Sequence, residues 1–296
     1  MDMNKLGWIG VGIMGSRMSR HLLGEDTELY VCDTAPENVD AMVKLGAKAV
    51  SSPAELAEKA DIIFAMIPNG QVLKGIIAGE NGLLQTIKAG QILVDMSTID
   101  PQSSAEAAAM LEEKGVYLMR SPVSGSTTFA EQATLKIMTS GDRDAFERIR
   151  PFLEKIGDQV TYVGAKEEAR YIKIAINMMN GNTSQMIAES MLLCEAAGLD
   201  MDMAVDLLAS SAAASPMIRV KADMLKSRDY TARGTIGITF KDMNIALQIA
   251  HDKQIALPMT ALSKQMYSAM MGRGQGDLDY YSLLMLNEEM NGIEPR

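Results

Sequence analysis

Hydrophobic and polar positions alternate in blocks along the first half of the chain. Helically spaced apolar residues, as in 37–46, separate short apolar runs of strand length. Continuous runs such as DIIFAMIP are typical of strands that are buried on both faces of a parallel sheet. The alternation predicts a doubly wound α/β domain. The predicted strands lie at 5–10, 28–33, 61–68, 91–97, 134–141 and 159–164.

The pattern changes after Gly164. From about 166 to 290 the chain has long helical patterns, brief Gly/Pro interruptions and no convincing strand. We therefore predict an α/β domain over 1–164 and an all-helical domain over 165–296. The length of 296 residues fits two domains of roughly 150 residues each.

A glycine-rich turn follows the first apolar run. Gly10, Gly12 and Gly15 form the pattern G-x-G-x-x-G between a predicted strand and a predicted helix, and Asp33 ends the next strand. The first glycine permits a tight turn, the second lets a pyrophosphate approach the backbone, and the third lets helix and strand pack closely. We predict that a dinucleotide binds here, with a plain βα turn as the alternative.

Asp33 bears on the choice of dinucleotide. A carboxylate at this place accepts hydrogen bonds from ribose hydroxyls and repels a 2′-phosphate. Thr34 follows it, and no arginine is adjacent to bind a phosphate. The sequence therefore favours NAD over NADP, and the alternative is a solvated residue at the end of a strand.

A polar stripe runs along an otherwise apolar helix in the second half. At about 100° per residue, Lys173, Asn177, Asn180 and Ser184 fall on one face. A helix that is apolar all round is usually buried, so the stripe should face a cleft or a polar partner. Lys173 is then either a general acid/base or a lysine whose charged end reaches water. Asn177, one turn further on, is placed to hold a substrate hydroxyl.

Charge and hydropathy indicate which kinds of molecule the protein binds. The net charge is −10 and no Lys/Arg-rich tract occurs, which argues against nucleic acid or an anionic membrane as the main partner. No apolar run reaches the roughly 18 residues that span a bilayer, and the N-terminus lacks the pattern of a signal peptide. Cys32 and Cys194 are far apart in the sequence, which indicates a reduced, cytosolic setting rather than a disulfide. No cluster of His, Cys and carboxylate residues has the spacing of metal ligands. We expect a cytoplasmic protein that binds a small molecule and no metal.

Four separated segments resemble the β-hydroxyacid dehydrogenases. This group includes 3-hydroxyisobutyrate dehydrogenase, tartronate semialdehyde reductase and the larger 6-phosphogluconate dehydrogenase. Four segments in the right order are far more specific than any one of them. They are GWIGVGIMGSRMSRHLL at 7–23, SPVSGS at 121–126, the spacing from Gly164 to Lys173 and Asn177, and FKDMNIALQIA at 240–250.

The resemblance implies a Rossmann domain joined by a long helix to an all-helical domain. It also implies the reversible NAD(P)-linked oxidation of a 3-hydroxy acid or reduction of its semialdehyde. Lys173 would be the acid/base and Asn177 would orient the substrate. Ser124, Gly125 and Ser126 would hold the substrate carboxylate, largely through backbone N–H groups. The implied cofactor contacts are Gly10, Gly12, Ile13, Met14, Gly15, Asp33, Pro68, Asn69, Thr98 and Lys241.

The chain departs from the family pattern on the substrate side. Arg120 stands where the family usually has an acidic residue, and Glu167, Glu168 and Ala169 replace a common Gly-x-Gly. Ser126 stands where the family usually has glycine, so its hydroxyl either reads a polar group on the substrate or caps the following helix. These changes bear on which acid is bound more than on the reaction class.

Two other functions are alternatives to a hydroxyacid dehydrogenase. Imine reductases share the fold and the cofactor but commonly lack the lysine at the catalytic position. A non-catalytic nucleotide-binding module would not need to keep Lys173, Asn177 and the 121–126 segment together.

Apolar helices in the second half favour a homodimer or a homotetramer.

Overall fold

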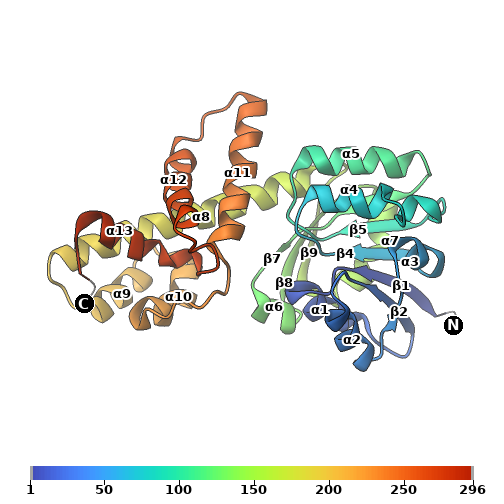
Figure 1. The fold of residues 1–296 in the computed structure, drawn as a ribbon, viewed down its shortest axis with the longest axis horizontal. Coiled ribbons are helices and arrows are strands. Elements are labelled where there is room, and N and C mark those ends of the chain that lie inside the picture. Colours follow the sequence, from blue (N-terminus) through green and yellow to red (C-terminus); the bar gives the residue numbers. More distant parts are fainter. Residues whose placement is uncertain (1–2, 295–296) are drawn as a thin grey trace. The chain divides into compact units, whose positions relative to one another are not determined.

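The computed structural model describes residues 3–294 (Figure 1). The chain divides into two compact units, Met1–Lys173 and Ile174–Arg296. The first unit alternates strands and helices around a sheet, and the second unit is helical. The predicted fold class is therefore confirmed.

One nine-stranded sheet forms the centre of the first unit. Its strands are β1 (Asn4–Ile9), β2 (Thr27–Cys32), β3 (Lys48–Ala49), β4 (Ile62–Ala65), β5 (Ile92–Asp95), β6 (Tyr117–Arg120), β7 (Val123–Ser124), β8 (Leu135–Ser140) and β9 (Gly157–Gly164). The order β3-β2-β1-β4-β5-β6 is parallel throughout and is that of a doubly wound α/β fold. The apolar runs of the sequence correspond to β1, β2, β4, β5, β8 and β9.

The direction of pairing changes at β8. Both β6 and β7 pair with β8 in antiparallel fashion, through Arg120 with Ser140 and Val123 with Ile137. On its other side β8 pairs in parallel with β9. The segment that begins at residue 121 therefore follows the end of β6 and pairs again with β8 through β7.

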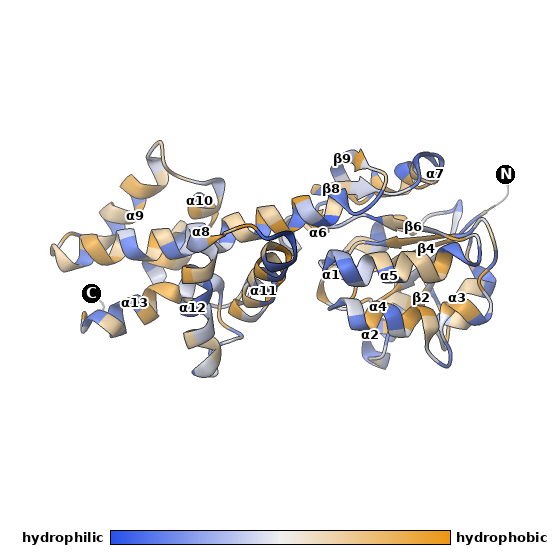
Figure 2. Cartoon of the chain, turned by 90° about the horizontal axis from the view of Figure 1, so that it is seen from above, coloured by the Kyte–Doolittle hydropathy of each residue, from blue (hydrophilic) through white to orange (hydrophobic). Residues whose placement is uncertain are grey.

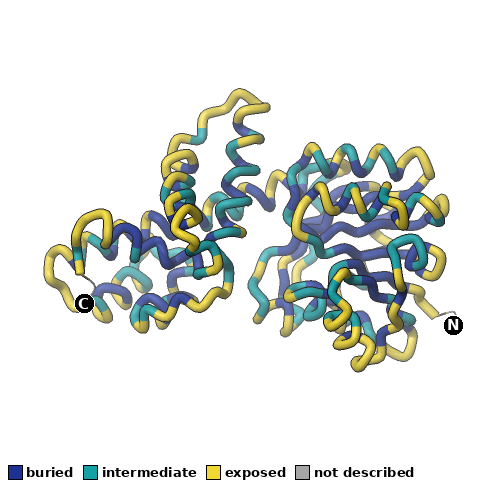
Figure 3. The backbone as a smooth tube through the Cα atoms, viewed as in Figure 1, coloured by how far each residue is buried: buried dark blue, intermediate teal, exposed yellow. Residues whose placement is uncertain are grey.

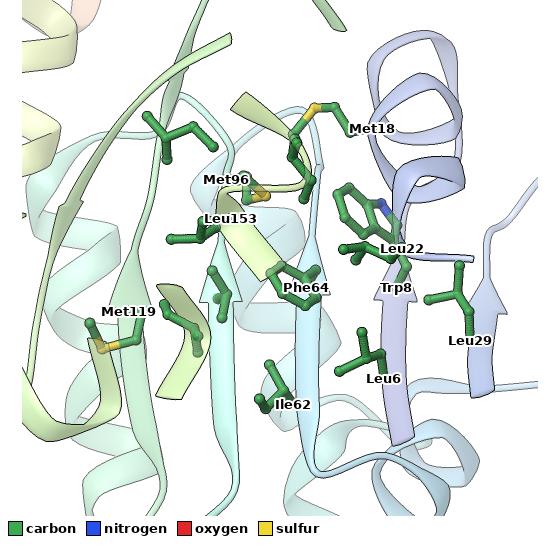
Figure 4. Close-up of a cluster of buried hydrophobic side chains, with 14 of the residues drawn as sticks. Leu6, Trp8, Met18, Leu22, Leu29, Ile62, Phe64, Met96, Met119 and Leu153 are labelled. Carbon is green, nitrogen blue, oxygen red and sulfur yellow. The ribbon is translucent and has the colours of Figure 1, made fainter. Parts of the chain in front are cut away.

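The central strands are buried on both faces. In β1, Leu6 and Trp8 belong to one hydrophobic cluster and Ile9 to the other, and in β4 the same division separates Phe64 from Ile63. Figure 4 shows the first cluster, and Figure 3 shows these strands in dark blue. Burial on both faces explains why the strands appear in the sequence as continuous apolar runs.

Helices cover each face of the sheet. One cluster includes residues of α1 (Ile13–Ser19), α2 (Pro36–Lys44), α6 (Thr127–Glu131) and α7 (Arg143–Leu153). The other includes residues of α3 (Pro53–Lys59), α4 (Gly70–Ala78) and α5 (Pro101–Glu112). Side chains of Ser52, Asn69, Asp100 and Asp142 accept hydrogen bonds from backbone N–H groups and so cap α3, α4, α5 and α7. Short 3₁₀ helices lie at η1 (Arg20–Leu22) and η2 (Leu83–Gln85).

The long helix α8 (Glu168–Ala196) begins in the first unit and continues into the second. The other elements of the second unit are α9 (Met201–Ser210), α10 (Pro216–Ser227), α11 (Ile236–Lys253), α12 (Pro258–Gly272), η3 (Tyr280–Ser282) and α13 (Leu283–Asn291). Their apolar faces share one core, and Figure 2 shows hydrophobic and hydrophilic residues mixed along them. Within 3–294 no helix has the length and apolar character needed to cross a bilayer.

A buried ion pair links separate segments of the second unit. Lys221 on α10 is 2% exposed and donates to Asp279, which is 0% exposed. Asp279 also accepts hydrogen bonds from the backbone N–H of Arg233 at 2.9 Å and of Tyr281 at 3.1 Å. The carboxylate thus ties α10 to two separate segments of the chain.

The glycine-rich turn after β1 is closely packed. The indole of Trp8 stacks on Phe64, and its Nε1 donates to the carbonyl oxygen of Gly10 at 3.0 Å. A Cβ atom at Gly15 would lie 1.9 Å from that same oxygen, whereas one at Gly12 would meet nothing within 4 Å. Gly15 is therefore required by packing, and Gly12 is not.

We expect Gly15→Ser to lower the free energy of unfolding by about 1–3 kcal/mol or more, since the added atoms must displace the backbone. Gly12→Ser is the matched control and should change it by less than about 0.5 kcal/mol, because serine is also a good N-cap. Urea unfolding followed by circular dichroism measures both. Equal losses in the two variants would contradict this account of the turn.

Candidate active site

The glycine-rich turn lies where the order of the strands reverses, between β1 and β4. In open α/β sheets, ligands bind at such points, outside the carboxyl ends of the strands. Gly12 is the N-cap of α1, Ile13 is 72% exposed, and Met14 is partly buried. The first N–H groups of a helix have no partner within it, and a Cβ atom at Gly12 would meet nothing within 4 Å. The turn therefore fits a pyrophosphate.

Asp33 holds this turn from the end of the neighbouring strand. Its Oδ2 accepts a hydrogen bond from Val11 N–H at 2.7 Å, and its Oδ1 accepts from Ala35 N–H at 2.8 Å. The side chain is only partly buried, and Thr34 beside it is exposed. The carboxylate that we expected to meet a ribose thus also fixes the shape of the glycine turn, which the sequence pattern did not reveal.

Two more loops begin at the same edge of the sheet, because β4 and β5 run parallel to β1. Pro68 and Asn69 follow β4 and are exposed, and Thr98 follows β5 and is partly buried. The side-chain oxygen of Asn69 accepts a hydrogen bond from Val72 N–H at 3.0 Å. Asn69 therefore caps α4, a structural role in addition to the cofactor contact expected of it.

The segment after β6 carries the three predicted substrate residues: Ser124 ends β7, and Gly125 and Ser126 follow it. Ser124 and Ser126 are partly buried, and Gly125 is exposed. Gly125 has a φ of 140°, and a Cβ there would lie 2.7 Å from Leu135. Only glycine adopts this conformation in this space. Ser126 occupies the N-cap position of α6, but its hydroxyl makes no capping hydrogen bond.

Lys173 and Asn177 lie one turn apart on α8. Lys173 is 9% exposed and belongs to the first unit. Asn177 belongs to the second unit, where its Nδ2 donates to Asp242 Oδ2 at 2.6 Å. Lys241 Nζ lies 3.4 Å from Asp242 Oδ1, and Asp242 is 2% exposed. An ionised carboxylate accepts and does not donate, so it orients the Asn177 amide and leaves a second N–H donor on Nδ2.

The rest of the polar stripe ends in the helical core. Asn180 is partly buried, and Ser184 is 1% exposed. The Ser184 hydroxyl lies 2.5 Å from the Tyr267 hydroxyl. Burial raises the pKa of Tyr267, and the hydrogen bond with Ser184 only partly offsets this effect. This end of the stripe meets a polar partner within the helical unit.

Arg120 and Glu167, two of the departures from the family pattern, form an ion pair. Arg120 is 8% exposed, and it donates to Glu167 and to the Leu118 carbonyl, the latter at 2.9 Å. The side chain of Glu167 is 13% exposed. The cation at the end of β6 is thus matched by an anion just before α8. Together they tie the start of the 121–126 loop to the start of the helix.

Glu168, the first residue of α8, has a lowered pKa. Burial on its own would raise this pKa, but hydrogen bonds from backbone N–H groups, including that of Lys166, outweigh it. A negative charge in the first turn also interacts favourably with the helix dipole. Glu168 therefore stabilises the beginning of the helix that carries Lys173.

Sequence reasoning missed a fully buried ion pair in this unit. Arg170 is 1% exposed, and its Nη2 donates to Asp95 Oδ2 at 2.5 Å. An acidic residue at the end of an apolar run and an arginine in an apolar helix are each visible in the sequence. Nothing in the sequence pairs them, because 75 positions separate them.

Two family models match the chain. Residues 5–164 match the NAD binding domain of 6-phosphogluconate dehydrogenase. Residues 168–286 match a domain described as NAD-binding of NADP-dependent 3-hydroxyisobutyrate dehydrogenase. Together they cover both units.

Similar proteins cover almost all of the chain. 2-(Hydroxymethyl)glutarate dehydrogenase from Eubacterium barkeri is 32% identical over 290 residues, which are 98% of this chain and 96% of that protein. 2-Hydroxy-3-oxopropionate reductase from Escherichia coli (strain K12) is 32% identical over 286 residues, 97% of this chain and 98% of that protein. The crystal structure of 3-hydroxyisobutyrate dehydrogenase from Salmonella typhimurium has a TM-score of 0.86 at 25% identity, covering 96% of this chain and all of that one. With a nicotinamide-binding Rossmann domain and relatives of this kind, the chain belongs to the β-hydroxyacid dehydrogenase family of oxidoreductases.

Proposed function

We propose that this protein catalyses the reversible, NAD-linked oxidation of a small 3-hydroxy acid to its semialdehyde. The observation that carries the proposal is Lys173, a lysine only 9% exposed on an apolar helix that starts beside the end of β5. A lysine held at this place on the helix can give and take a proton, which is the role that the family resemblance implies for it. The relatives that are named as a dehydrogenase and a reductase of small hydroxy acids support this reaction class.

In the direction of oxidation, neutral Lys173 accepts the proton of the substrate hydroxyl at Nζ. Asn177 donates its second N–H to the substrate oxygen, while its first is held by Asp242. When bound, the nicotinamide supplies the acceptor for the hydride. In the direction of reduction, protonated Lys173 returns the proton to the oxygen.

The substrate carboxylate is held by backbone N–H groups of Ser124, Gly125 and Ser126. Successive N–H groups in a turn with a left-handed residue can converge on an anion, and Gly125 has such a conformation. Fixing the carboxylate also fixes the direction of the carbinol hydrogen. The proposed cofactor contacts are Gly10, Gly12, Ile13, Met14, Gly15, Asp33, Pro68, Asn69, Thr98 and Lys241.

Lys173→Ala should lower kcat by about a hundredfold or more, because proton transfer typically contributes about 10²–10⁴. The affinity for NAD should stay near that of the wild type. The measurement is the absorbance of the reduced cofactor with a panel of 3-hydroxy acids, with fluorescence titration for NAD. Lys114→Ala, at an exposed lysine of the first unit, is the control and should keep full activity. Near-normal kcat in Lys173→Ala would remove the acid/base assignment.

The wild-type enzyme should use NAD with a higher kcat/KM than NADP, because the Asp33 carboxylate repels a 2′-phosphate. Asp33→Ser combined with Thr34→Arg should shift the preference toward NADP. Thr34→Arg alone keeps the bond from Val11 to Asp33, and so separates cofactor choice from damage to the turn. A wild-type enzyme that already prefers NADP would refute this role of Asp33.

Ser126 should favour substrates with a polar group over those with a methyl group. Its hydroxyl makes no capping bond, and leaving a polar group unpaired on substrate binding costs about 1–3 kcal/mol. We expect Ser126→Gly to raise kcat/KM for methyl-bearing acids relative to polar ones. Thr128→Ala, at an exposed position of the same helix, should leave the ratio unchanged. If Ser126→Gly also leaves it unchanged, Ser126 does not read the substrate.

Exposed apolar side chains on α8 support assembly as a homodimer or homotetramer. Met179, Met186 and Leu193 follow one another at seven-residue intervals along α8 and are 64%, 52% and 73% exposed. Large apolar side chains at this interval form a stripe that a second helix can cover. Sedimentation velocity would report such an assembly, and a monomer at micromolar concentration would argue against it.

A further inference from the structure

Arg170 is a buried cation in the first turn of α8. All three of its guanidinium nitrogens donate hydrogen bonds: Nη2 to Asp95 Oδ2 at 2.5 Å, Nη1 to the Ser97 carbonyl at 2.6 Å and Nε to Ser104 Oγ at 3.3 Å. Arg170 is 1% exposed, and Asp95, at the end of β5, is 0% exposed. The pair therefore ties the beginning of α8 to the carboxyl end of a central strand.

The hydrogen bonds continue from Asp95 to the neighbouring strand. The hydroxyl of Ser97 donates to Asp95 Oδ1 at 2.5 Å and accepts from Ile67 N–H at 2.8 Å. Ile67 directly precedes Pro68, and Ser97 directly precedes Thr98. One connected set of hydrogen bonds thus joins the first turn of α8 to the loops after β4 and β5.

Stability alone does not account for this pair. Removing two charges from water is expensive, and apolar residues of similar volume are often at least as stable in such places. The helix start has further tethers: Arg120 binds Glu167, and Ser140 Oγ donates to the Lys166 carbonyl at 2.7 Å. Contacts on both sides of residue 168 fix where the helix begins and how it is rotated about its axis.

The position of Lys173 depends on that rotation. It lies one turn after Arg170, about 4.5 Å further along the helix axis. A lysine side chain is long, so a small rotation of the helix moves its amine considerably. A displacement of about 1 Å can lower a rate about a hundredfold. The planar fork of an arginine fixes direction as well as distance, which a single ammonium group does not.

We propose that Arg170 and Asp95 are a positioning pair that sets Lys173 against the loops following β4 and β5. Neither residue touches a reacting atom. They act through the first turn of α8 and through Ser97. The catalytic consequence rests on the proposed function, whereas the placement of Lys173 does not.

Arg170→Lys tests the pair because it keeps a cation beside Asp95 and removes the planar fork with its bonds to Ser97 and Ser104. Asp95→Asn keeps the shape of the carboxylate and removes its charge. Asp279→Asn is the matched control, since it breaks another buried ion pair, the one with Lys221 in the second unit. The main readout is the rate at which acetic anhydride labels the Lys173 amine, measured by mass spectrometry across pH. Thermal melting, NAD affinity and kcat are measured beside it.

We expect Arg170→Lys and Asp95→Asn to change the labelling rate of Lys173 by about fivefold or more and to lower kcat by about ten- to a hundredfold, with NAD affinity retained. Asp279→Asn should lower Tm and leave the labelling rate and kcat unchanged. Labelling of Lys173 that is the same as wild type in both variants overturns the proposal. Because labelling needs no substrate, a wild-type protein that turns over no acid contradicts the proposed function, while labelling still decides the placement of Lys173.

Discussion

A guanidinium buried against the end of the sheet constrains where the long helix begins. Arginine does not lose its proton in proteins, so a buried one must have its nitrogens bonded. Asp95, Ser97 and Ser104 therefore have to stand where Arg170 reaches them, and these residues come from β5, the loop after it and α5. Strand, loop and helix are fixed by one set of contacts, and Lys173 takes its place from them.

The candidate site offers anion-binding groups within an acidic protein. The chain carries a net charge of −10, whereas the groups that we propose for binding anions are neutral backbone N–H groups of the glycine turn and the 121–126 segment. Such dipoles bind a phosphate or a carboxylate at short range without attracting anions from a distance. The Asp33 carboxylate accepts a hydrogen bond from Val11 N–H and so holds the shape of the turn. In the proposed function, this combination suits a small acid as the substrate.

Local pattern explains which features could be predicted from the sequence. Strands such as β1 and β4 are continuous apolar runs because both of their faces are buried, and the glycine turn is a motif within six residues. β6 escaped prediction because its four residues end in Arg120, whose charge pairs with Glu167, 47 positions later. Arg170 and Asp95 are further apart still, and a sequence pattern records no distance between such residues. The motifs could therefore be recognised in the sequence, and the contacts that surround them could not.

Trp8 is the one tryptophan in the sequence. Its indole is 0% exposed, stacks on Phe64 and donates a hydrogen bond to the carbonyl of Gly10. Tryptophan emission from this protein therefore arises beside the glycine turn and from no second site. Its wavelength and yield respond to the polarity and hydrogen bonding of that one place, so the unlabelled chain contains an optical reporter of events at the turn.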